Sequence, residues 1–325
     1  MWGSWSARWQ ARHGELLILA TVLGVAAALL AVLTGGKLLV LGSVESMAFQ
    51  MPLLGVLALA QMLPMLTGGI DLSIISTANF AGITAALILK QVPAWYATPA
   101  AILAALGGAL GVGALNGGVV AGAGVSPIIA TLATMILVKG VALVVTRGYV
   151  LSGFPTPFLV LGGGSVLGIP VPFLLLAACG ALMALTLARA PFGIVEYMMG
   201  SNPTATRFSG IHTRGMLFRT YLISSFLAGV AGLIMIARFN AAQADYGSSF
   251  LLLTVLTCVL GGVDPSGGVG TAFGLGIAVV ILQVVATGFN LLGLSAHLAN
   301  ALWGIILILV VVLRRTLSGA AGTPS

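Results

Sequence analysis

The sequence predicts an all-α integral membrane protein, a polytopic bundle of about ten transmembrane helices forming a single domain over residues 1–325. Hydrophobic residues make up 59% of the chain and charged residues 6%, and the apolar residues fall into long runs. Soluble domains are roughly 45–50% apolar and about 25% charged. A globule in water does not need so much apolar surface, so the composition indicates a lipid environment.

Ten apolar segments carry this prediction, and a transmembrane helix needs about 20 mostly apolar residues. The eighth segment is short. The first follows a basic stretch, but it is longer than the roughly 7–15-residue core of a signal peptide, so we interpret it as an uncleaved span. The segments are Leu16–Thr34, Gln50–Leu66, Ile74–Leu89, Ala94–Leu115, Pro127–Val145, Val171–Leu187, Met216–Ala237, Phe250–Leu260, Thr271–Thr287 and Ser295–Leu313.

The distribution of basic residues predicts a multi-pass membrane protein with both termini in the cytoplasm, because Lys and Arg concentrate in cytoplasmic loops. Three cytoplasmic segments are expected: an amphipathic N-terminus at 1–14, a large loop at 188–220 and a tail at 314–325. Lys139 lies inside the fifth segment, where it could snorkel or face the protein interior. The cytoplasmic side then carries Arg8, Arg12, Arg189, Arg207, Arg214, Arg219, Arg314 and Arg315, and the other side Lys37, Lys90, Arg147 and Arg238.

Several chemistries are not expected from this sequence. The net charge of +7 fits membrane topology, whereas nucleic-acid binding would need a continuous basic surface. Cys179 and Cys258 lie in apolar runs and are interpreted as small buried side chains. The sequence has no phosphate-binding loop, metal-ligand cluster or nucleophile elbow. We therefore expect no cofactor, no metal site, no catalytic residue and no enzymatic activity.

The acidic residues bear on the energy source of any transport. All of them lie at span ends or in loops, whereas proton-coupled carriers usually place carboxylates inside the bundle. We expect none inside this bundle, so energy for uphill transport would enter through another subunit. The acidic residues are Glu15, Glu45, Asp71, Glu196, Asp245 and Asp264.

The loop at 188–220 gathers polar and basic residues in an otherwise apolar chain. Asn202 before Pro203 is typical of an N-cap followed by proline at the first helical position, and Gly210 is a plausible stop. The sequence therefore predicts a helix of about two turns carrying Arg207. Such a helix could dock into a soluble partner, or the loop could simply obey the charge rule for cytoplasmic segments.

Two short motifs resemble each other. Gly68-Gly-Ile-Asp-Leu-Ser73 and Gly261-Gly-Val-Asp-Pro-Ser266 each lie between two predicted spans and on the same predicted side, which suggests a parallel repeat or convergence on one turn. Asp71 or Ser73 could cap the third helix, or Asp71 could form a cytoplasmic gate beside a substrate path. Asp264 has the same two interpretations.

Polar residues inside spans are costly unless they are paired or face water. Asn116 could end the fourth helix as a cap, and Asn79 and Asn116 could both line a substrate path. Small residues at four-residue spacing favour close helix packing, either within the chain or between two copies. These pairs are Gly107/Gly111, Gly113/Gly117, Gly118/Gly122 and Gly270/Gly274.

Taken together, the motifs resemble those of the ribose-type, monosaccharide permease family of ATP-binding cassette importers, over nearly the whole chain. The matching segments are Thr67-Gly-Gly-Ile-Asp-Leu-Ser73, Asn116-Gly, Ile129-Ala-Thr-Leu-Ala-Thr-Met135, Gly200 through Ile211, Leu260-Gly-Gly, Gly267-Gly-Val-Gly270 and Gly288-Phe-Asn-Leu-Leu-Gly293.

The resemblance implies a permease subunit that moves a monosaccharide or similar small polar solute by alternating access. Its partners would be a second permease copy or paralogue, two ATPase subunits, a periplasmic or lipid-anchored sugar-binding protein and membrane lipid. Asp71 would lie at the cytoplasmic mouth of the third helix. The residues implied to engage the ATPase are Asn202, Pro203, Arg207, Ser209, Gly210 and Ile211.

The sequence also departs from the family pattern. Thr204 and Thr206 stand where an acidic residue and Ala are frequent, Asp264-Pro265 replaces a small polar pair, and Lys139 replaces a frequent Arg. These departures put in doubt which ATPase is recognised and whether the permease pairs with itself. The alternatives are a nucleoside or branched-chain amino-acid permease of a related family and a gradient-driven carrier acting alone.

Overall fold

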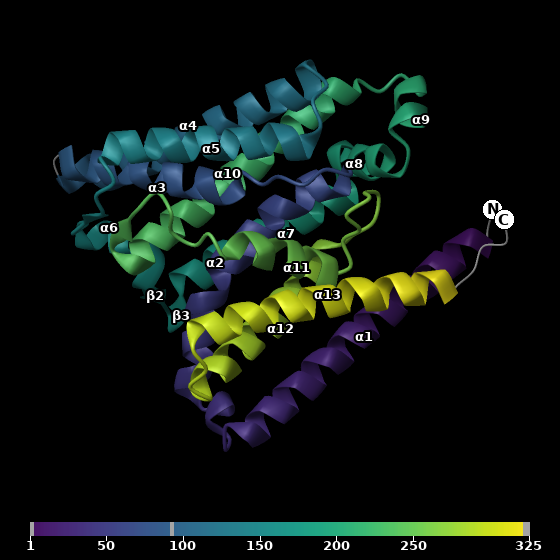
Figure 1. Ribbon diagram of the computed structural model, residues 1–325, viewed down its shortest axis with the longest axis horizontal. Helices are drawn as coiled ribbons and strands as arrows, with labels where there is room; N and C mark the ends of the chain where they lie inside the picture. The colour runs from purple at the N-terminus through teal and green to yellow at the C-terminus, as the bar shows by residue number, and fades with distance from the viewer. Residues whose placement is uncertain (1–2, 92–93, 321–325) are drawn as a thin grey trace.

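The chain folds into a bundle of helices with two minimal strand pairs (Figure 1). The computed structural model describes residues 3–91 and 94–320, and it describes side chains for 16–91, 96–295, 297–308 and 312. The predicted amphipathic character of 1–14 and the predicted tail at 314–325 therefore lie outside the described side chains. Within the described backbone, α1 is one continuous helix from Gly3 to Leu33.

The α-helices are α1 Gly3–Leu33, α2 Leu41–Leu66, α3 Ile74–Gln91, α4 Ala94–Gly117, α5 Pro127–Thr146, α6 Thr156–Gly163, α7 Val171–Arg189, α8 Pro191–Ser201, α9 Pro203–Phe208, α10 Thr213–Phe239, α11 Phe250–Leu260, α12 Ala272–Leu291 and α13 Ala296–Ala320. A 3₁₀ turn covers Lys37–Leu39, and a π turn extends α4 over Gly118–Gly122. The strand β1 (Leu151–Ser152) pairs antiparallel with β4 (Ala241–Ala242), and β2 (Ser165–Val166) pairs with β3 (Ile169–Pro170).

The predicted all-α membrane fold is confirmed. Eight helices in the described part of the chain are long and apolar enough to cross a bilayer. A shorter apolar helix lies at Phe250–Leu260, and the part of α13 with described side chains, His297–Ile308, is also apolar. These two correspond to the eighth and tenth predicted segments. The total agrees with the expectation of about ten spans, and the segment predicted to be short is indeed a short helix, α11.

Successive long helices run in alternating directions, which brings several loops to one end of the bundle. In Figure 1 the beginning of α1, the end of α13 and the helices α8 and α9 all lie toward the right-hand end. The loops that follow α2 and α11 reach the same end, since both contact α8. We call this the α9 end.

Four helices form the centre of the bundle: α10 packs against α2, α3 and α4. Small residues permit this close approach. A Cβ atom at Gly232 on α10 would overlap the Ala78 carbonyl oxygen on α3, and one at Gly113 on α4 would lie 2.8 Å from the Tyr221 carbonyl oxygen. Of the glycine pairs predicted to pack, Gly113/Gly117 contacts α10, whereas Gly107/Gly111 and Gly118/Gly122 face open space.

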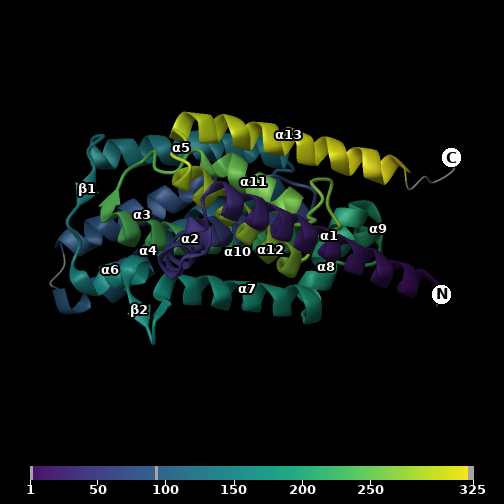
Figure 2. The same cartoon turned by 90° about the horizontal axis from the view of Figure 1, so that it is seen from below.

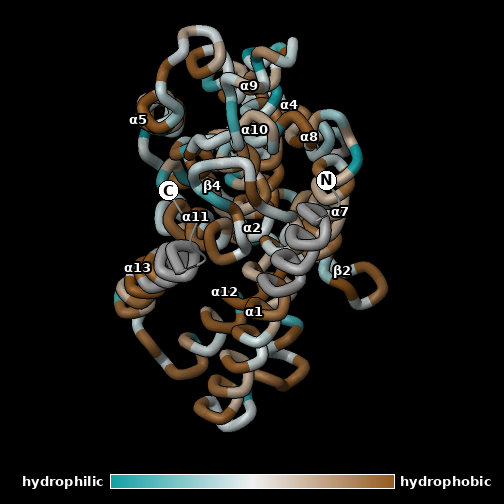
Figure 3. The backbone as a smooth tube through the Cα atoms, turned by 90° about the vertical axis from the view of Figure 1, so that its right-hand side faces the viewer, coloured by the Kyte–Doolittle hydropathy of each residue, from teal (hydrophilic) through white to brown (hydrophobic). Residues whose placement is uncertain are grey.

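The peripheral helices present apolar side chains outward. In the most apolar window of α2, 83% of residues are buried inside the chain, but the corresponding value for α1 is only 11%. Figure 2 shows α7 along one side of the bundle and α5 and α13 along the opposite side. Hydrophilic stretches of the tube lie near α9, whereas the turns of α12 and α1 are mostly hydrophobic (Figure 3). A chain whose outer helices are apolar requires lipid around it.

Candidate coupling site and polar interior

The predicted short helix is present as α9, and its local geometry follows from its sequence. Asn202 is the N-cap: its Oδ1 accepts a hydrogen bond from the Ala205 N–H at 2.9 Å. Pro203 occupies the first turn, where a missing N–H costs nothing. After Ser209 the chain turns at Gly210, whose φ of +82° suits glycine, and so α9 ends within two turns.

α9 projects from the bundle (Figure 1). It carries exposed basic and aromatic side chains. Phe208 is 87% exposed and Arg207 is exposed beside it, while Thr206 is buried. An exposed aromatic residue next to an arginine is a combination enriched at protein–protein contacts. Of the residues predicted for coupling, Ile211 is half-buried and the others are exposed.

The helix preceding α9, α8, packs against the end of α2 and the loop at 261–270. A Cβ atom at Gly200, near the end of α8, would overlap both the Leu66 carbonyl oxygen and the Gly268 N–H. Those two groups also bond to each other, since the Gly268 N–H donates to the Leu66 carbonyl at 2.9 Å. Tyr197 on α8 adds a hydrogen bond from its hydroxyl to the Gly270 carbonyl at 2.8 Å. The start of the α9 segment is therefore in direct contact with the end of α2 and the loop at 261–270.

Asp71 lies in the loop between α2 and α3 and is buried, with 1% of its surface exposed. Its Oδ1 accepts hydrogen bonds from the Ser73 N–H at 2.8 Å and the Ser73 hydroxyl at 2.6 Å. Both of these bonds tie the carboxyl to Ser73, the residue just before α3. Burial raises the pKa of Asp71 to about 6, against the opposing effect of these hydrogen bonds.

Two further helices hold this loop. Asn116 on α4 donates from Nδ2 to the Ser73 hydroxyl oxygen at 2.7 Å. The Gln61 amide on α2, in the orientation that satisfies both of its polar atoms, donates to the Asp71 carbonyl at 2.9 Å and accepts from the Asp71 N–H at 3.3 Å. Asn116 does not cap the end of its helix, because the helical backbone continues into the π turn. It serves instead as a tertiary contact.

A second buried carboxyl, Glu196 on α8, lies near this network. The Thr220 hydroxyl on α10 donates to Glu196 Oε1, and burial raises the pKa of Glu196 to about 8. The adjacent Tyr221 is fully buried, and its hydroxyl lies 3.2 Å from the position a Cβ atom would take at Gly69. Among the described residues five buried polar atoms here lack a hydrogen-bond partner: Asp71 Oδ2, Asn116 Oδ1, Glu196 Oε2, Tyr221 Oη and Ser225 Oγ.

The expectation that no carboxylate lies inside the bundle was wrong. Asp71 and Glu196 are both buried, although one is in a loop and the other on a short helix outside the spans. Position along the chain does not reveal burial, because α8 folds back against α2 and α10. The available signal for Glu196 was a lone charge within the apolar stretch Phe192–Met199.

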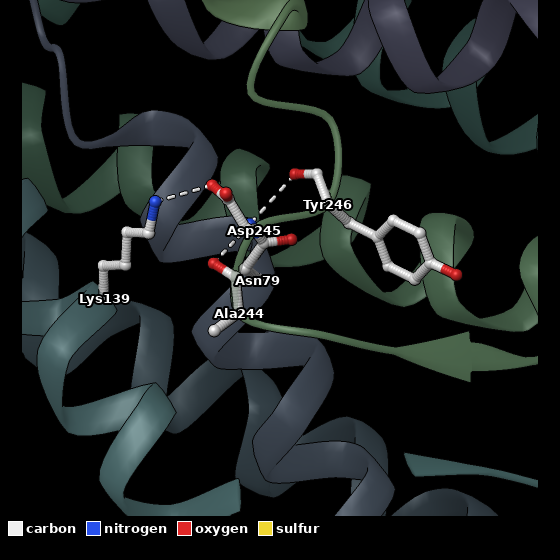
Figure 4. Close-up of polar contacts among 5 residues, drawn as sticks. All are labelled: Asn79, Lys139, Ala244, Asp245 and Tyr246. Carbon is white, nitrogen blue, oxygen red and sulfur yellow. Dashed lines mark hydrogen bonds and ion pairs between the residues drawn. The ribbon is translucent and has the colours of Figure 1, made fainter. Parts of the chain in front are cut away.

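The structure separates Asn79 from Asp71 and Asn116. Asn79 lies on α3 and donates from Nδ2 to the Ala244 carbonyl at 3.2 Å and the Tyr246 carbonyl at 3.0 Å (Figure 4). Both acceptors belong to the segment between β4 and α11. In the described part of the chain, no three His, Cys, Asp or Glu side chains come close enough to hold a metal ion.

Comparison with known proteins bears on this arrangement. The family described as "Branched-chain amino acid transport system / permease component" matches residues 43–311, which is more than half of the chain. The chain belongs to this permease family. The matched range includes the loops at 67–73 and 261–270 together with α8 and α9.

Relatives in several bacteria match most of the permease. It is 31% identical over 266 residues to the autoinducer 2 import system permease protein LsrD of Yersinia enterocolitica, covering 80% of this chain and 79% of that protein. It is 34% identical over 268 residues to the ribose import permease protein RbsC of Bacillus subtilis, covering 82% of each. LsrD of Enterobacter sp. strain 638 is 30% identical over 272 residues, again 82% of each. No solved structure matches the chain at a comparable level.

Proposed function

We propose that this permease is the membrane subunit of an ATP-driven importer of a monosaccharide or a similar small polar solute. Its relatives are named as permeases for ribose and for autoinducer 2, which favours a sugar-like cargo over the amino acids in the family description. A sugar-binding protein would deliver the solute, two ATPase subunits would supply the energy, and a second copy or paralogue would complete the membrane pathway. The permease itself would carry no catalytic chemistry.

The observation that carries the coupling part of this proposal is the glycine contact at Gly200. An ATPase pair that grips α9 would pull on α8, and α8 directly contacts the end of α2 and the loop at 261–270. Because packed backbone cannot yield at these contacts, a displacement of α9 would reach the ends of α2 and α11 as a rigid movement. Alternation between the two openings of the pathway would follow from that movement.

The orientation of the permease is part of the proposal. α9 and both chain ends would lie in the cytoplasm of the cell and the chain would reside in the inner membrane, because the exposed Arg207 and its basic neighbours at the α9 end obey the charge rule. Asp71, Ser73 and Asn116 would then lie at the cytoplasmic mouth. There their buried contacts would hold α3 and α4 together beside the pathway.

The coupling role is tested by changing α9 without disturbing the bundle. Arg207→Glu reverses an exposed charge on α9, and Gly210→Pro forces φ from +82° toward about −65° at the turn that ends it. Both variants should reduce ATP-driven ribose uptake in proteoliposomes at least ten-fold and should release the ATPase during co-purification. The thermal unfolding midpoint of the isolated permease should stay within about 2 °C, a shift of under roughly 1 kcal/mol.

Arg189→Glu is the matched control, since Arg189 is also exposed but lies at the end of α7 and outside α9. It should keep most of the uptake and of the ATPase binding. Equal losses from Arg189→Glu and Arg207→Glu would mean that the general positive charge of this end matters and that α9 is not a specific docking element. Uptake by the permease alone, driven by a sodium or proton gradient, would replace the proposal with a gradient-driven carrier.

A further inference from the structure

The segment between α10 and α11 enters the bundle and stops partway through it. After Phe239 the chain forms β4, which pairs with β1 at the end opposite α9. It then runs back until Asn79 binds the carbonyls of Ala244 and Tyr246. Asn79 lies five residues after Ile74, the first residue of α3 at the α9 end, so this contact is about 8 Å along that helix.

α11 begins partway along the bundle and is short. It covers Phe250–Leu260, about 16 Å of helix against a hydrocarbon core of about 30 Å. Phe250 packs against a buried cluster of Leu54, Leu256 and Leu282, and Leu54 lies near the middle of α2. Irregular backbone at membrane depth is tolerated only inside protein or along a water-filled cavity. Here the segment exposes Asp245, Ser248 and Ser249.

An ion pair joins this segment to α5. The Lys139 ammonium lies 2.7 Å from Asp245 Oδ1, and the two side chains are 42% and 54% exposed (Figure 4). Lys139 follows Pro127 by twelve residues and precedes Thr146 by seven, so it lies about 18 Å from one end of α5 and about 10 Å from the other. The pair is thus half-exposed within the depth of the membrane.

Lipid is not a suitable neighbour for this pair. A charged side chain near the centre of a bilayer is energetically costly, and exposed peptide groups add to that cost. The opposite face of α5 differs: a shallow surface groove there is lined only by Ile136, Leu137, Gly140, Val141, Val144 and Val145. One helix therefore presents an apolar face and a charged face at the same depth.

We propose that Lys139, Asp245 and the exposed serines before α11 form a solute-contacting site of the permeation pathway, which takes a neutral polyhydroxylated solute. This inference rests on the proposed function for the identity of the solute. The ammonium offers donors, the Asp245 carboxylate offers acceptors, and the Ser248 and Ser249 hydroxyls offer both. A paired site of zero net charge suits hydroxyl groups and holds an ionic solute poorly.

Cysteine labelling tests whether the charged face meets water. Single substitutions Lys139→Cys, Ser248→Cys and Leu137→Cys are placed in the full-length permease in proteoliposomes and treated with a positively charged methanethiosulfonate. Leu137 is the matched control, because it lies two residues from Lys139 on the apolar face and is 56% exposed. Unsubstituted protein supplies the background from Cys179 and Cys258.

We expect the Lys139→Cys and Ser248→Cys variants to react at least ten-fold faster than the Leu137→Cys variant. The site would be overturned if Leu137→Cys and Lys139→Cys reacted at equal rates. It would also be overturned if both Lys139→Cys and Ser248→Cys failed to react. Ser248→Cys keeps the ion pair intact, so a folding defect in Lys139→Cys does not leave the question open. Because labelling needs no ATPase, its result stays separate from a failure of the proposed function, which would appear as wild-type protein that neither binds an ATPase nor accumulates ribose.

Transport by charge variants then tests contact with the solute. Asp245→Asn and Lys139→Gln should each lower ATP-driven ribose uptake at least five-fold while ATPase binding persists. The exchange of both charges, Lys139→Asp with Asp245→Lys, should recover part of the uptake, because it restores a neutral pair of donors and acceptors. Uptake within two-fold of wild type in both single variants would remove the pair from the pathway.

Discussion

The two glycine-rich loops, at 67–73 and 261–270, show how one local motif is used in two environments. Each follows a helix end with Gly-Gly, and in each an aspartate Oδ1 accepts the N–H two residues later at 2.8 Å, Ser73 to Asp71 and Ser266 to Asp264. The loops also touch: a Cβ atom at Gly68 would lie 3.1 Å from the Ser266 carbonyl oxygen. The motif therefore produces the same turn twice, at the same end of the bundle.

The surroundings of the two turns differ. Asp71 is buried and its backbone is held by Gln61, while Asn116 reaches Ser73 from α4. Asp264 is partly exposed and is followed by an exposed Pro265 and Ser266. The turn is a local property, but among the described residues only the first turn is held by side chains of α2 and α4, Gln61 and Asn116. We infer that the first loop holds helices together and that the second transmits contact from α8.

The largest effect is expected where α8 touches both loops at once. Gly200→Val should abolish ribose uptake and lower the unfolding midpoint, because its side chain would overlap backbone at Leu66 and Gly268, and overpacking costs about 1–3 kcal/mol. Gly111→Ala on α4, where nothing lies within 4 Å, is the control and should behave as wild type. Normal uptake in Gly200→Val would show that the two loops move independently of α8.

A smaller and unequal effect is expected from truncating the two aspartates. Asp71→Ala should destabilise the permease by about 1–3 kcal/mol, because it leaves buried polar groups of Ser73 without their acceptor. Asp264→Ala should cost about 0.5–1 kcal/mol, since water can replace a partly exposed acceptor. Thermal unfolding of both variants in detergent measures the difference, and equal costs would contradict the contrast in burial.

An effect that depends on pH is expected from the second carboxyl beside the first loop. The pKa of Glu196 is raised from 4.5 to about 8, so the folded protein binds a proton that the unfolded chain releases between these values. Its stabilising contribution is present below about pH 4.5 and is lost as pH rises through about 8. Glu196→Gln should therefore flatten the decline of the unfolding midpoint between about pH 5 and about pH 8.5.

Asp71→Asn is the control for the pH series, because Asp71 titrates over a lower pH range than Glu196. Burial raises the pKa of Asp71 from 3.8 to about 6, so this substitution should change the midpoint profile mainly below about pH 6.5. We expect the unfolding midpoint of Glu196→Gln to fall less steeply with pH than that of wild type across the window of Glu196, and Asp71→Asn to leave this slope unchanged above about pH 6.5. Parallel curves for wild type and Glu196→Gln would indicate an ionised, hydrated carboxyl.

Local patterns predicted the features that depend on neighbouring residues. Asn202 and Pro203 predicted the cap and first turn of α9, and Gly210 predicted its end, because capping involves groups only a few residues apart. Apolar runs predicted the spans for a similar reason, since the length of a run alone decides whether it can cross a bilayer. The eighth predicted segment is short because α11 itself covers only about half of a bilayer.

The sequence did not predict contacts between residues that lie far apart along the chain. Asn79 and Asn116 were grouped as equivalent polar residues, yet Asn116 bonds to Ser73 whereas Asn79 holds the segment before α11. The sequence does not decide whether Lys139 snorkels or faces the interior, because its partner Asp245 lies 106 residues further along the chain. Nothing in spacing or composition links residues so far apart, because their meeting depends on how whole helices pack.

The sequence alone predicted the lipid environment, the spans, the short helix α9 and its cap. Each of these depends on the solvent or on bonds within a few residues. Tertiary structure decided the burial of Asp71 and Glu196, the packing at Gly200 and the pairing of Lys139 with Asp245. The physical reason is range: transfer to lipid and capping act on a segment by itself. Burial and ion pairing require two segments to be brought together by the packing of the entire bundle.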